Sequence, residues 1–130
     1  MKTFIVEDSL MIRERLRSMM ASIPNIELVG ETDNEIDAVQ EIGRVCPDVV
    51  ILDLVLANGS GMEVLRRIKG QPPASKVIVL TNHGYPQYQK KCMELGADYF
   101  MDKSREIETL SDLLVSLADG QPQHHQYKSS

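Results

Sequence analysis

Short apolar runs alternate with longer amphipathic stretches five times along this chain, and that alternation constrains the fold more than any other feature. The runs are rich in β-branched and aromatic residues and lie at 3–6, 26–29, 49–52, 77–80 and 99–101. In the stretches after them, apolar residues recur at spacings of three and four, which is typical of helices. Five strand-helix units in succession predict one α/β domain, in which a doubly wound parallel sheet carries helices on both faces.

Helix start signals support these boundaries. Thr32 with Glu35 and Ser60 with Glu63 have the spacing of a capping box, in which two side chains satisfy backbone amides of the first turn. Pro86 suits the first turn of the fourth helix, where a missing N–H leaves no hydrogen bond unmade. We therefore expect the second, third and fourth helices to begin near these positions.

Length and charge exclude several classes of protein. The 130 residues, 42% of them hydrophobic, are enough for one domain with its own core. A net charge of −5 without a basic block argues against binding to nucleic acid or to an anionic membrane surface. The amino terminus has too few apolar residues for a signal peptide, and no apolar run approaches the length of a membrane span.

Two further expectations concern the cysteines and the carboxyl terminus. Cys46 and Cys92 lie in segments of helical periodicity without CxxC spacing, so we expect buried free thiols in a reducing compartment, the cytoplasm. Residues 1–118 form the predicted domain. Residues 119–130 are polar and lack apolar periodicity, which predicts a frayed tail or the stub of a linker to a further domain.

The residues that follow the apolar runs carry the chemistry. In an open parallel sheet, ligands bind beyond the carboxyl ends of the strands. The polar residues at these ends are Glu7 and Asp8 after the first run, Asp53 after the third, Thr81 after the fourth and Lys103 after the fifth. If these four strands are neighbours, three carboxylates, a hydroxyl and an ammonium group converge on one edge of the sheet.

Such a cluster fits phosphoryl transfer. Three carboxylates repel one another and Lys103 supplies a single compensating charge, so a hard divalent cation with oxygen ligands, such as Mg²⁺, is implied. Transfer of a phosphoryl group needs a nucleophile, a cation, a lysine that neutralises the phosphoryl oxygens and a hydrogen-bond donor. Asp53 is the natural nucleophile, because a carboxylate can form an acyl phosphate.

Taken singly, most of these residues have a simpler structural explanation. Asp8 or Ser9 would serve as a helix cap, Thr81 as a β-branched strand end, and Lys103 as a surface lysine. Asp53 is harder to explain, because it follows a strongly apolar run where an unpaired charge is costly. The three histidines have no cysteine or carboxylate partner at metal spacing, so no zinc site is predicted.

The order and spacing of these residues resemble those of the response-regulator receiver domain of two-component signalling. The resemblance extends from residue 1 to about residue 118. The matching positions are Glu7, Asp8, Asp53, Gly61, Thr81, Phe100 and Lys103. The resemblance implies a flavodoxin-like sheet of order 2-1-3-4-5. It also implies a phosphorylatable regulatory domain rather than an enzyme, which takes a phosphoryl group from a histidine kinase or a histidine phosphotransfer protein and catalyses only its own phosphorylation and dephosphorylation.

The resemblance implies a role for each site residue. The ligands of Mg²⁺ or Mn²⁺ are Asp8, Asp53 and the carbonyl of Val55 directly, and Glu7 through water. The residues that act in phosphoryl transfer are Asp53, Thr81 and Lys103. Thr81 and Phe100 are implied to pass the phosphorylated state to the face formed by the fourth helix, the fifth strand and the fifth helix. An output partner, or an output domain beyond the carboxyl terminus, would receive the signal, and a homodimer is one oligomeric state left open.

The sequence departs from the commonest pattern of this family at three positions. Ala57 stands where proline is often found, and Asn82 stands where the residue is usually small. Ser104 stands where proline is frequent after a cis peptide bond, so the conformation of the Lys103–Ser104 bond is left open. These departures bear on kinetics rather than on phosphorylation itself.

Three other functions compete with this one. A flavodoxin-like cofactor binder would need a glycine-rich or hydroxyl-rich loop after the first strand, where Glu7 and Asp8 would repel a phosphate. An aspartyl phosphohydrolase would carry a second acidic residue near Asp53, but position 55 is valine. A pseudo-receiver that acts only as an interaction module is disfavoured by the intact set of acidic, hydroxyl and lysine residues.

Overall fold

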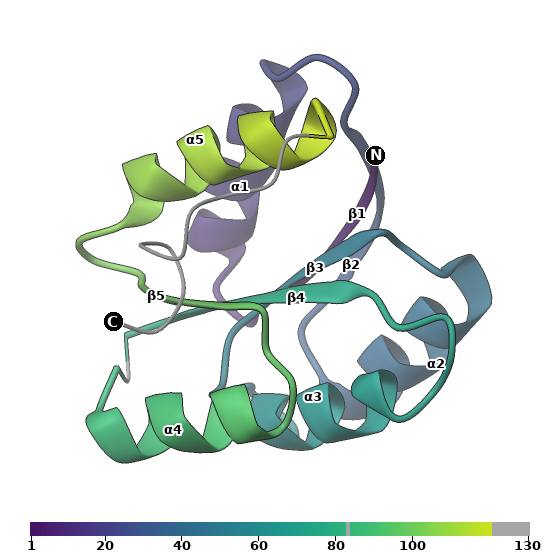
Figure 1. Cartoon of the computed structure of the whole chain (residues 1–130), viewed down its shortest axis with the longest axis vertical. Helices are drawn as coiled ribbons and strands as arrows, with labels where there is room; N and C mark the ends of the chain where they lie inside the picture. Colours follow the sequence, from purple (N-terminus) through teal and green to yellow (C-terminus); the bar gives the residue numbers. More distant parts are fainter. Residues whose placement is uncertain (83, 121–130) are drawn as a thin grey trace.

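The computed structural model describes residues 1–82 and 84–120, and in this part of the chain five strands alternate with five helices. The strands are β1 (Lys2–Val6), β2 (Glu27–Thr32), β3 (Val49–Leu52), β4 (Lys76–Thr81) and β5 (Tyr99–Asp102). The helices are α1 (Leu10–Ala21), α2 (Glu35–Val45), α3 (Gly61–Lys69), α4 (Pro86–Glu94) and α5 (Ile107–Ala118). The strands are parallel in the order β2-β1-β3-β4-β5, so the expected flavodoxin-like sheet is confirmed (Figure 1).

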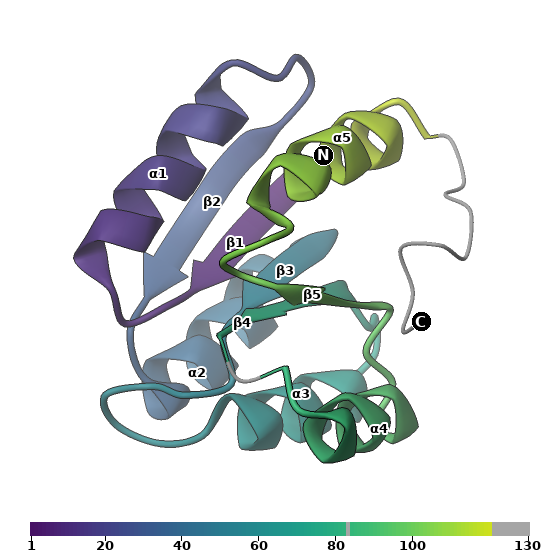
Figure 2. The ribbon, with the colours of Figure 1, turned by 90° about the vertical axis from the view of Figure 1, so that its left-hand side faces the viewer.

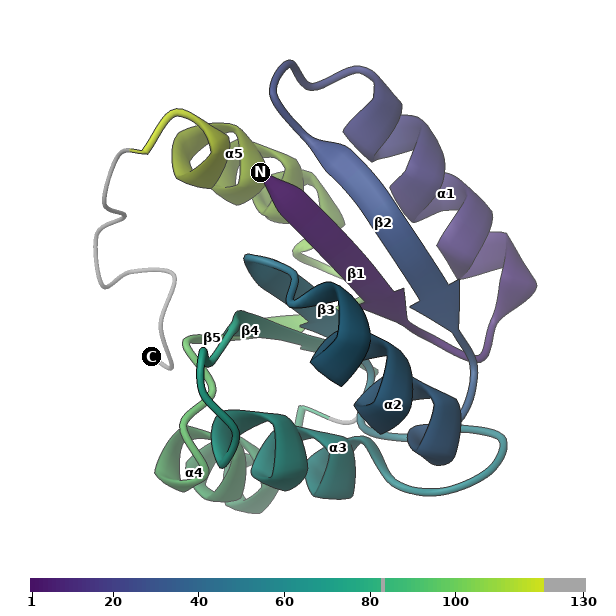
Figure 3. The ribbon, with the colours of Figure 1, turned by 90° about the vertical axis from the view of Figure 1, so that its right-hand side faces the viewer.

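The helices cover both faces of the sheet, as Figures 2 and 3 show from opposite sides. Helices α1 and α5 lie on one face, and α2, α3 and α4 lie on the other. On the first face, Leu16 and Leu114 lie in one apolar cluster with Ile51. On the second face, Leu65 lies in a separate cluster with Val50. Because β3 is buried on both sides, its residues form a continuous apolar run rather than an alternating one.

The residues that follow β1, β3 and β5 remain hydrogen-bonded to the neighbouring strand. The backbone N–H of Glu7 donates to a carbonyl of β2, that of Asp53 to a carbonyl of β1 and that of Lys103 to a carbonyl of β4, each at 2.9 Å. The ladder therefore runs one step past the end of each of these strands. It fixes the backbone of all three residues at the carboxyl edge of the sheet, where ligands bind in folds of this kind.

Two local predictions are wrong. The side chain of Asn34, rather than that of Thr32, caps α2 and accepts a hydrogen bond from the backbone N–H of Asp37. Thr32 is instead the last residue of β2, which continues beyond its apolar run. Cys46 is exposed, because it ends α2 in the left-handed conformation with a φ of 48°. Cys92 is buried as predicted, and both thiols are free.

Other local predictions are confirmed. Ser60 caps α3 and accepts a hydrogen bond from the backbone N–H of Glu63, and Pro86 opens α4. The conformation of the Lys103–Ser104 bond, which the sequence leaves open, is trans, because among the described residues the cis peptide bond is Pro72–Pro73.

Part of the prediction for the carboxyl terminus falls outside the described residues. Helix α5 ends at Ala118, the last residue of the predicted domain. Residues 121–130, with His124 and His125, are not described, and neither is His83. Within residues 1–82 and 84–120, no helix combines the length and the apolar character that a membrane crossing requires.

Candidate functional site

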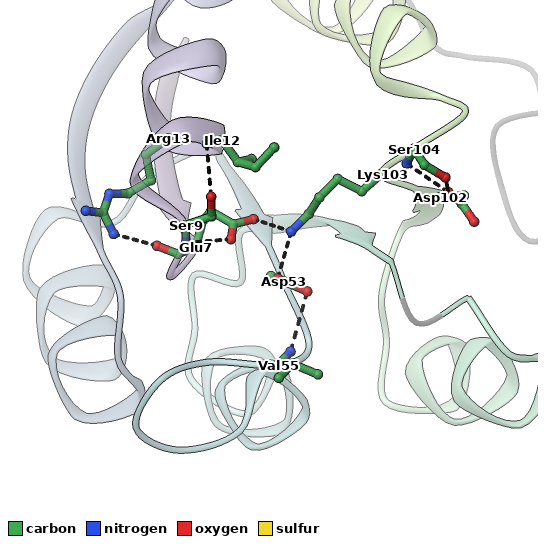
Figure 4. A network of polar contacts seen from close by, with 9 residues as sticks. All are labelled: Glu7, Ser9, Ile12, Arg13, Asp53, Val55, Asp102, Lys103 and Ser104. Carbon is green, nitrogen blue, oxygen red and sulfur yellow. Dashed lines mark hydrogen bonds and ion pairs between the residues drawn. The ribbon is translucent and has the colours of Figure 1, made fainter.

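A buried lysine joins two buried carboxylates at the carboxyl edge of the sheet. Lys103 Nζ lies 2.7 Å from Glu7 Oε1 and 2.9 Å from Asp53 Oδ2 (Figure 4). Lys103 is 8% exposed, Glu7 2% and Asp53 5%. Because all three groups are withdrawn from water, each carboxylate depends on the ammonium group of Lys103 for its stabilisation, and the ammonium group depends on the two carboxylates.

Asp8 adds a third carboxylate from the solvent side. Carboxylate oxygens of Glu7, Asp8 and Asp53 lie within 4.8 Å of one another, and Asp8 is exposed while the other two residues are buried. Ser9 caps α1, since its Oγ accepts a hydrogen bond from the backbone N–H of Ile12 at 3.3 Å. Helix capping therefore does not account for Asp8, and the three carboxylates singled out in the sequence do come together.

Burial dominates the electrostatics of this cluster. It raises the pKa of Glu7 above its ordinary value, against the opposing effect of the hydrogen bond from Lys103. The negative charge of Asp53 adds to this rise. Burial alone would lower the pKa of Lys103, but the hydrogen bonds to Glu7 and Asp53 and the negative charges of these two residues together outweigh burial, and the net shift is upward. The lysine is thus held in its charged form, while keeping Glu7 ionised costs free energy.

Asp53 opens a tight loop that leads into α3. Its Oδ1 accepts a hydrogen bond from the backbone N–H of Val55 at 3.4 Å, and Val55 itself is 48% exposed. Gly61, the first residue of α3, lies directly against the loop and donates its N–H to the carbonyl of Leu54 at 2.9 Å. A Cβ at Gly61 would lie 1.9 Å from the backbone oxygen of Asp53, so only glycine allows this approach of α3 to the site.

Thr81 and Phe100, the two residues expected to transmit the signal, lie on the neighbouring strands β4 and β5. Thr81, the last residue of β4, is fully buried and pairs with Asp102 of β5. Phe100 pairs with Val79 and is 8% exposed. Its ring belongs to the apolar cluster on the face of α2, α3 and α4, together with Cys92 of α4. The ring of Phe100 therefore occupies an inward position in this structure.

A cavity of about 480 Å³ borders Lys103. Asn82 and Ser104, two of the positions that depart from the common family pattern, contribute to its wall. Arg15 of α1 and Arg105 also line it, together with the acidic side chain of Glu108. With three cations and one carboxylate, the lining carries a net positive charge.

The sequence does not predict two contacts at the site. Arg13 donates through Nη1 to the backbone oxygen of Glu7 at 2.8 Å, and its Nε lies 3.2 Å from Glu31 Oε1. Asp102 accepts hydrogen bonds from Ser104, two residues further on. No motif marks an arginine six residues after a strand-end glutamate. The order Asp-x-Ser, in contrast, is a known turn signal and would have identified the second contact.

The chain matches one family over most of its length. Residues 3–115 match the family model described as the response regulator receiver domain. The chain belongs to the response regulator receiver family. The resemblance drawn from the sequence is therefore confirmed, and with it the coarse function of a phosphorylatable regulatory domain in a two-component system.

Individual receiver-containing proteins are similar in sequence and in structure. A putative transcriptional regulator of Pseudomonas aeruginosa is 35% identical over 115 residues, which are 88% of this chain and 54% of that protein. A DNA-binding response regulator of the LuxR family from Staphylococcus aureus is 31% identical with a TM-score of 0.81, over 90% of this chain and 98% of that chain. The Mn²⁺-bound form of the response regulator Rcp1 is 25% identical with a TM-score of 0.72, over 89% of this chain and 90% of that chain. The receiver chain thus spans about half the length of the Pseudomonas relative.

Proposed function

We propose that this receiver domain takes a phosphoryl group from a histidine kinase or a histidine phosphotransfer protein onto Asp53, in a reaction that depends on Mg²⁺ or Mn²⁺. The observation that carries the proposal is the environment of Asp53, a buried carboxylate paired with Lys103 at the edge where three carboxylates gather. A carboxylate that only supported the fold would have its charge balanced. Here three carboxylates gather, and one ammonium group pairs with two of them.

The donor set at this edge fits a hard divalent cation. The carboxylate oxygens of Glu7, Asp8 and Asp53 are close together, and oxygen ligands of this kind are the ones that Mg²⁺ prefers. Asp8 is exposed, which gives a cation a path from solvent. We assign Asp8, Asp53 and the carbonyl of Val55 as direct ligands and Glu7 as a ligand through water. A cation held there would neutralise charge on the phosphoryl oxygens, and the similarity to a Mn²⁺-bound response regulator supports this assignment.

The chain's own groups account for the rest of the transfer. A carboxylate oxygen of Asp53 attacks the phosphorus atom of a phosphohistidine and forms an acyl phosphate. The N–P bond of the donor breaks, and the imidazole nitrogen leaves with the bonding electrons and takes up a proton. Lys103 Nζ, 2.9 Å from Asp53 Oδ2, is close enough to neutralise the developing charge on the phosphoryl oxygens.

We assign signal output to Thr81 and Phe100. The hydroxyl of Thr81 donates to the acyl phosphate, and its movement changes the space available to the ring of Phe100. Helix α4, strand β5 and helix α5 lie along one edge of the molecule and form the surface that an output partner or output domain reads (Figure 1). In this proposal residues 1–118 are the receiver domain. It works in the cytoplasm, where its two free thiols stay reduced.

Intact mass spectrometry after incubation with acetyl phosphate and Mg²⁺ tests the proposal. The wild-type protein should gain a single phosphoryl group, and Asp53→Asn should gain none. Asp112→Asn, which alters an exposed carboxylate of α5, is the matched control and should behave as the wild type. A pseudo-receiver that acts only as an interaction module would gain nothing under any condition. A gain that survives Asp53→Asn would contradict the assignment of the acceptor.

A further inference from the structure

The turn that follows β5 is closed by the side chains of the residues on either side of Lys103. Asp102 Oδ1 accepts hydrogen bonds from the backbone N–H of Ser104 at 2.9 Å and from its Oγ at 2.6 Å (Figure 4). The backbone N–H of Asp102 donates to Glu106 Oε1 at 3.2 Å. A carboxylate bonded to the residue two positions on forms an Asx-turn, so Lys103 is the middle residue of a closed turn.

The sheet holds Lys103 from the other side. Its backbone N–H donates to the carbonyl of Thr81 at 2.9 Å, one step past the strand end. In Figure 4 the lysine side chain leaves the turn toward Asp53, while Asp102 and Ser104 stay at its base. Asp102 therefore acts on the ammonium group through the backbone rather than by contact with Nζ.

We propose that Asp102 and Ser104 are positioning residues, which aim the ammonium group of Lys103 at Asp53 by closing this turn. A lysine side chain has several rotatable bonds, and ordering it costs conformational entropy. A fixed backbone removes part of this cost, because the base of the side chain is already in place when Nζ reaches the carboxylates. Any rotation in the turn would be amplified along the length of the side chain.

Ser104 supplies two hydrogen-bond donors that proline, which is frequent at this position in the family, lacks. Proline has neither a backbone N–H nor a hydroxyl, so it could form neither of the bonds to Asp102. Here both donors of Ser104 meet one carboxylate oxygen, and these two bonds hold the pKa of Asp102 below its usual range. The acceptor is therefore ionised at neutral pH, which strengthens both hydrogen bonds. Hydrogen bonding thus rigidifies the turn that proline would rigidify by its ring.

A simpler explanation is that the turn stabilises the fold without acting on Lys103. Three variants separate the two roles. Ser104→Ala removes the Oγ donor and keeps the N–H, whereas Asp102→Ala removes the acceptor of both bonds. Asp102→Asn keeps an oxygen acceptor at Oδ1. A fourth protein combines Asp102→Ala with Ser104→Ala. If the two residues act as one unit, this double variant should be phosphorylated no more slowly than Asp102→Ala alone.

This inference rests on the proposed function, so two readouts are needed. The first is the rate constant of phosphorylation by acetyl phosphate with Mg²⁺. This rate constant should fall about threefold in Ser104→Ala and about tenfold in Asp102→Ala. In Asp102→Asn it should stay near the wild-type value. The second is the ¹⁵N NMR signal of the Lys103 ammonium group, which should be sharp in the wild type and broadened in Asp102→Ala. Ser22→Ala is the control and should change neither readout, because it removes an exposed hydroxyl that donates a hydrogen bond to the backbone oxygen of Met19 at 2.8 Å, in another part of the fold.

The outcomes separate the inference from the proposed function. Broadening of the Lys103 signal, together with a double variant no slower than Asp102→Ala, supports the positioning role. An unchanged Lys103 signal in Asp102→Ala would overturn it, and so would effects of the two single variants that multiply in the double variant. If the wild-type protein takes up no phosphoryl group, the proposed function fails, and the NMR signal still decides whether Asp102 positions Lys103.

Discussion

Replacing Lys103 by methionine tests the electrostatic account of the site most directly. Methionine keeps much of the apolar stem of lysine but lacks the ammonium group that lies 2.7 Å from Glu7 and 2.9 Å from Asp53. Both carboxylates are buried, so neither recovers the lost stabilisation from water. We expect Lys103→Met to be much less stable than the wild type at neutral pH without a divalent cation.

The size of the loss follows from the burial of the pair. Removing one partner of a buried ion pair costs about 3 to 5 kcal/mol. In a domain of this length each kcal/mol shifts the melting temperature by roughly 3 to 5 °C, so the expected fall is on the order of 10 to 25 °C. Lys90→Met, at an exposed position on α4, is the matched control and should change stability by less than about 0.5 kcal/mol.

The loss should depend on pH. Burial raises the pKa of Glu7 and the hydrogen bond from Lys103 opposes that rise, so removing Lys103 raises the pKa further. A carboxyl group with a raised folded pKa contributes its full stability below the unfolded value of 4.5 and loses it as pH rises through the folded pKa. The difference in stability between variant and wild type should therefore be small near about pH 4 and widen toward neutral pH.

In alkaline solution the difference in stability between Lys103→Met and the wild type should change in the opposite direction. The raised pKa of Lys103 contributes stability to the wild type that is complete below the unfolded value of 10.5 and is lost as pH rises through the folded pKa. The variant lacks this contribution at every pH. The difference should therefore narrow again in strongly alkaline solution.

Thermal unfolding followed by circular dichroism, in acid and at neutral pH, with and without Mg²⁺, measures these effects. Mg²⁺ should stabilise Lys103→Met more than the wild type, because the cation replaces charge that the variant has lost. The opposite result would be that Lys103→Met has the melting temperature of the wild type at neutral pH, or that the two melting temperatures differ as much in acid as at neutral pH. Lys103 would then not be the charge on which the buried carboxylates depend.

Three further variants test neighbouring residues. Asp8→Asn should weaken Mg²⁺ binding in calorimetric titrations and slow phosphorylation, without lowering the melting temperature of the metal-free protein, because one of three repelling charges is removed. Gly61→Ala should lower the free energy of unfolding in urea by more than about 2 kcal/mol, since its Cβ would lie 1.9 Å from the backbone oxygen of Asp53; wild-type stability would contradict the close approach. Thr81→Ala should leave phosphorylation intact but abolish the beryllofluoride-induced shift of a fluorine label on Phe100. No shift in the wild type would exclude the switch.

The apolar runs predict the central strand β3 better than the edge strand β2. The bounds of β3 match the run at 49–52, because all of its residues are buried on both faces of the sheet. Strand β2 was expected to end at Val29 but continues to Thr32, and its last residues are only half-buried. Glu31 in this extension pairs with Arg13 of α1. An edge strand that faces a charged helix surface has no apolar run to mark its end.

The positions of the charged residues at the site could be predicted because the backbone ladder alone dictates them. Glu7, Asp53 and Lys103 each directly follow the last residue of a strand, and parallel strands end at the same edge. The contacts that hold these residues in place could not be predicted in the same way. Arg13 acts through a backbone oxygen of Glu7, and Ser104 acts through a turn. The first contact depends on the path of the loop after β1, which periodicity does not describe, and the second is indicated only by the local turn sequence Asp-x-Ser.

The charge imbalance at the sheet edge argues for a ligand rather than for structural support. A second cation is near, since Arg13 Nη1 lies 2.8 Å from the backbone oxygen of Glu7, but its guanidinium group pairs with Glu31 instead. Within the described part of the chain, Lys103 is the one cation paired with the carboxylates of Glu7 and Asp53. Keeping Glu7 ionised against its raised pKa lowers stability, and proteins retain such losses where activity depends on them. An arginine turned toward these carboxylates would stabilise the fold, and it would remove the negative charge that can attract a divalent cation.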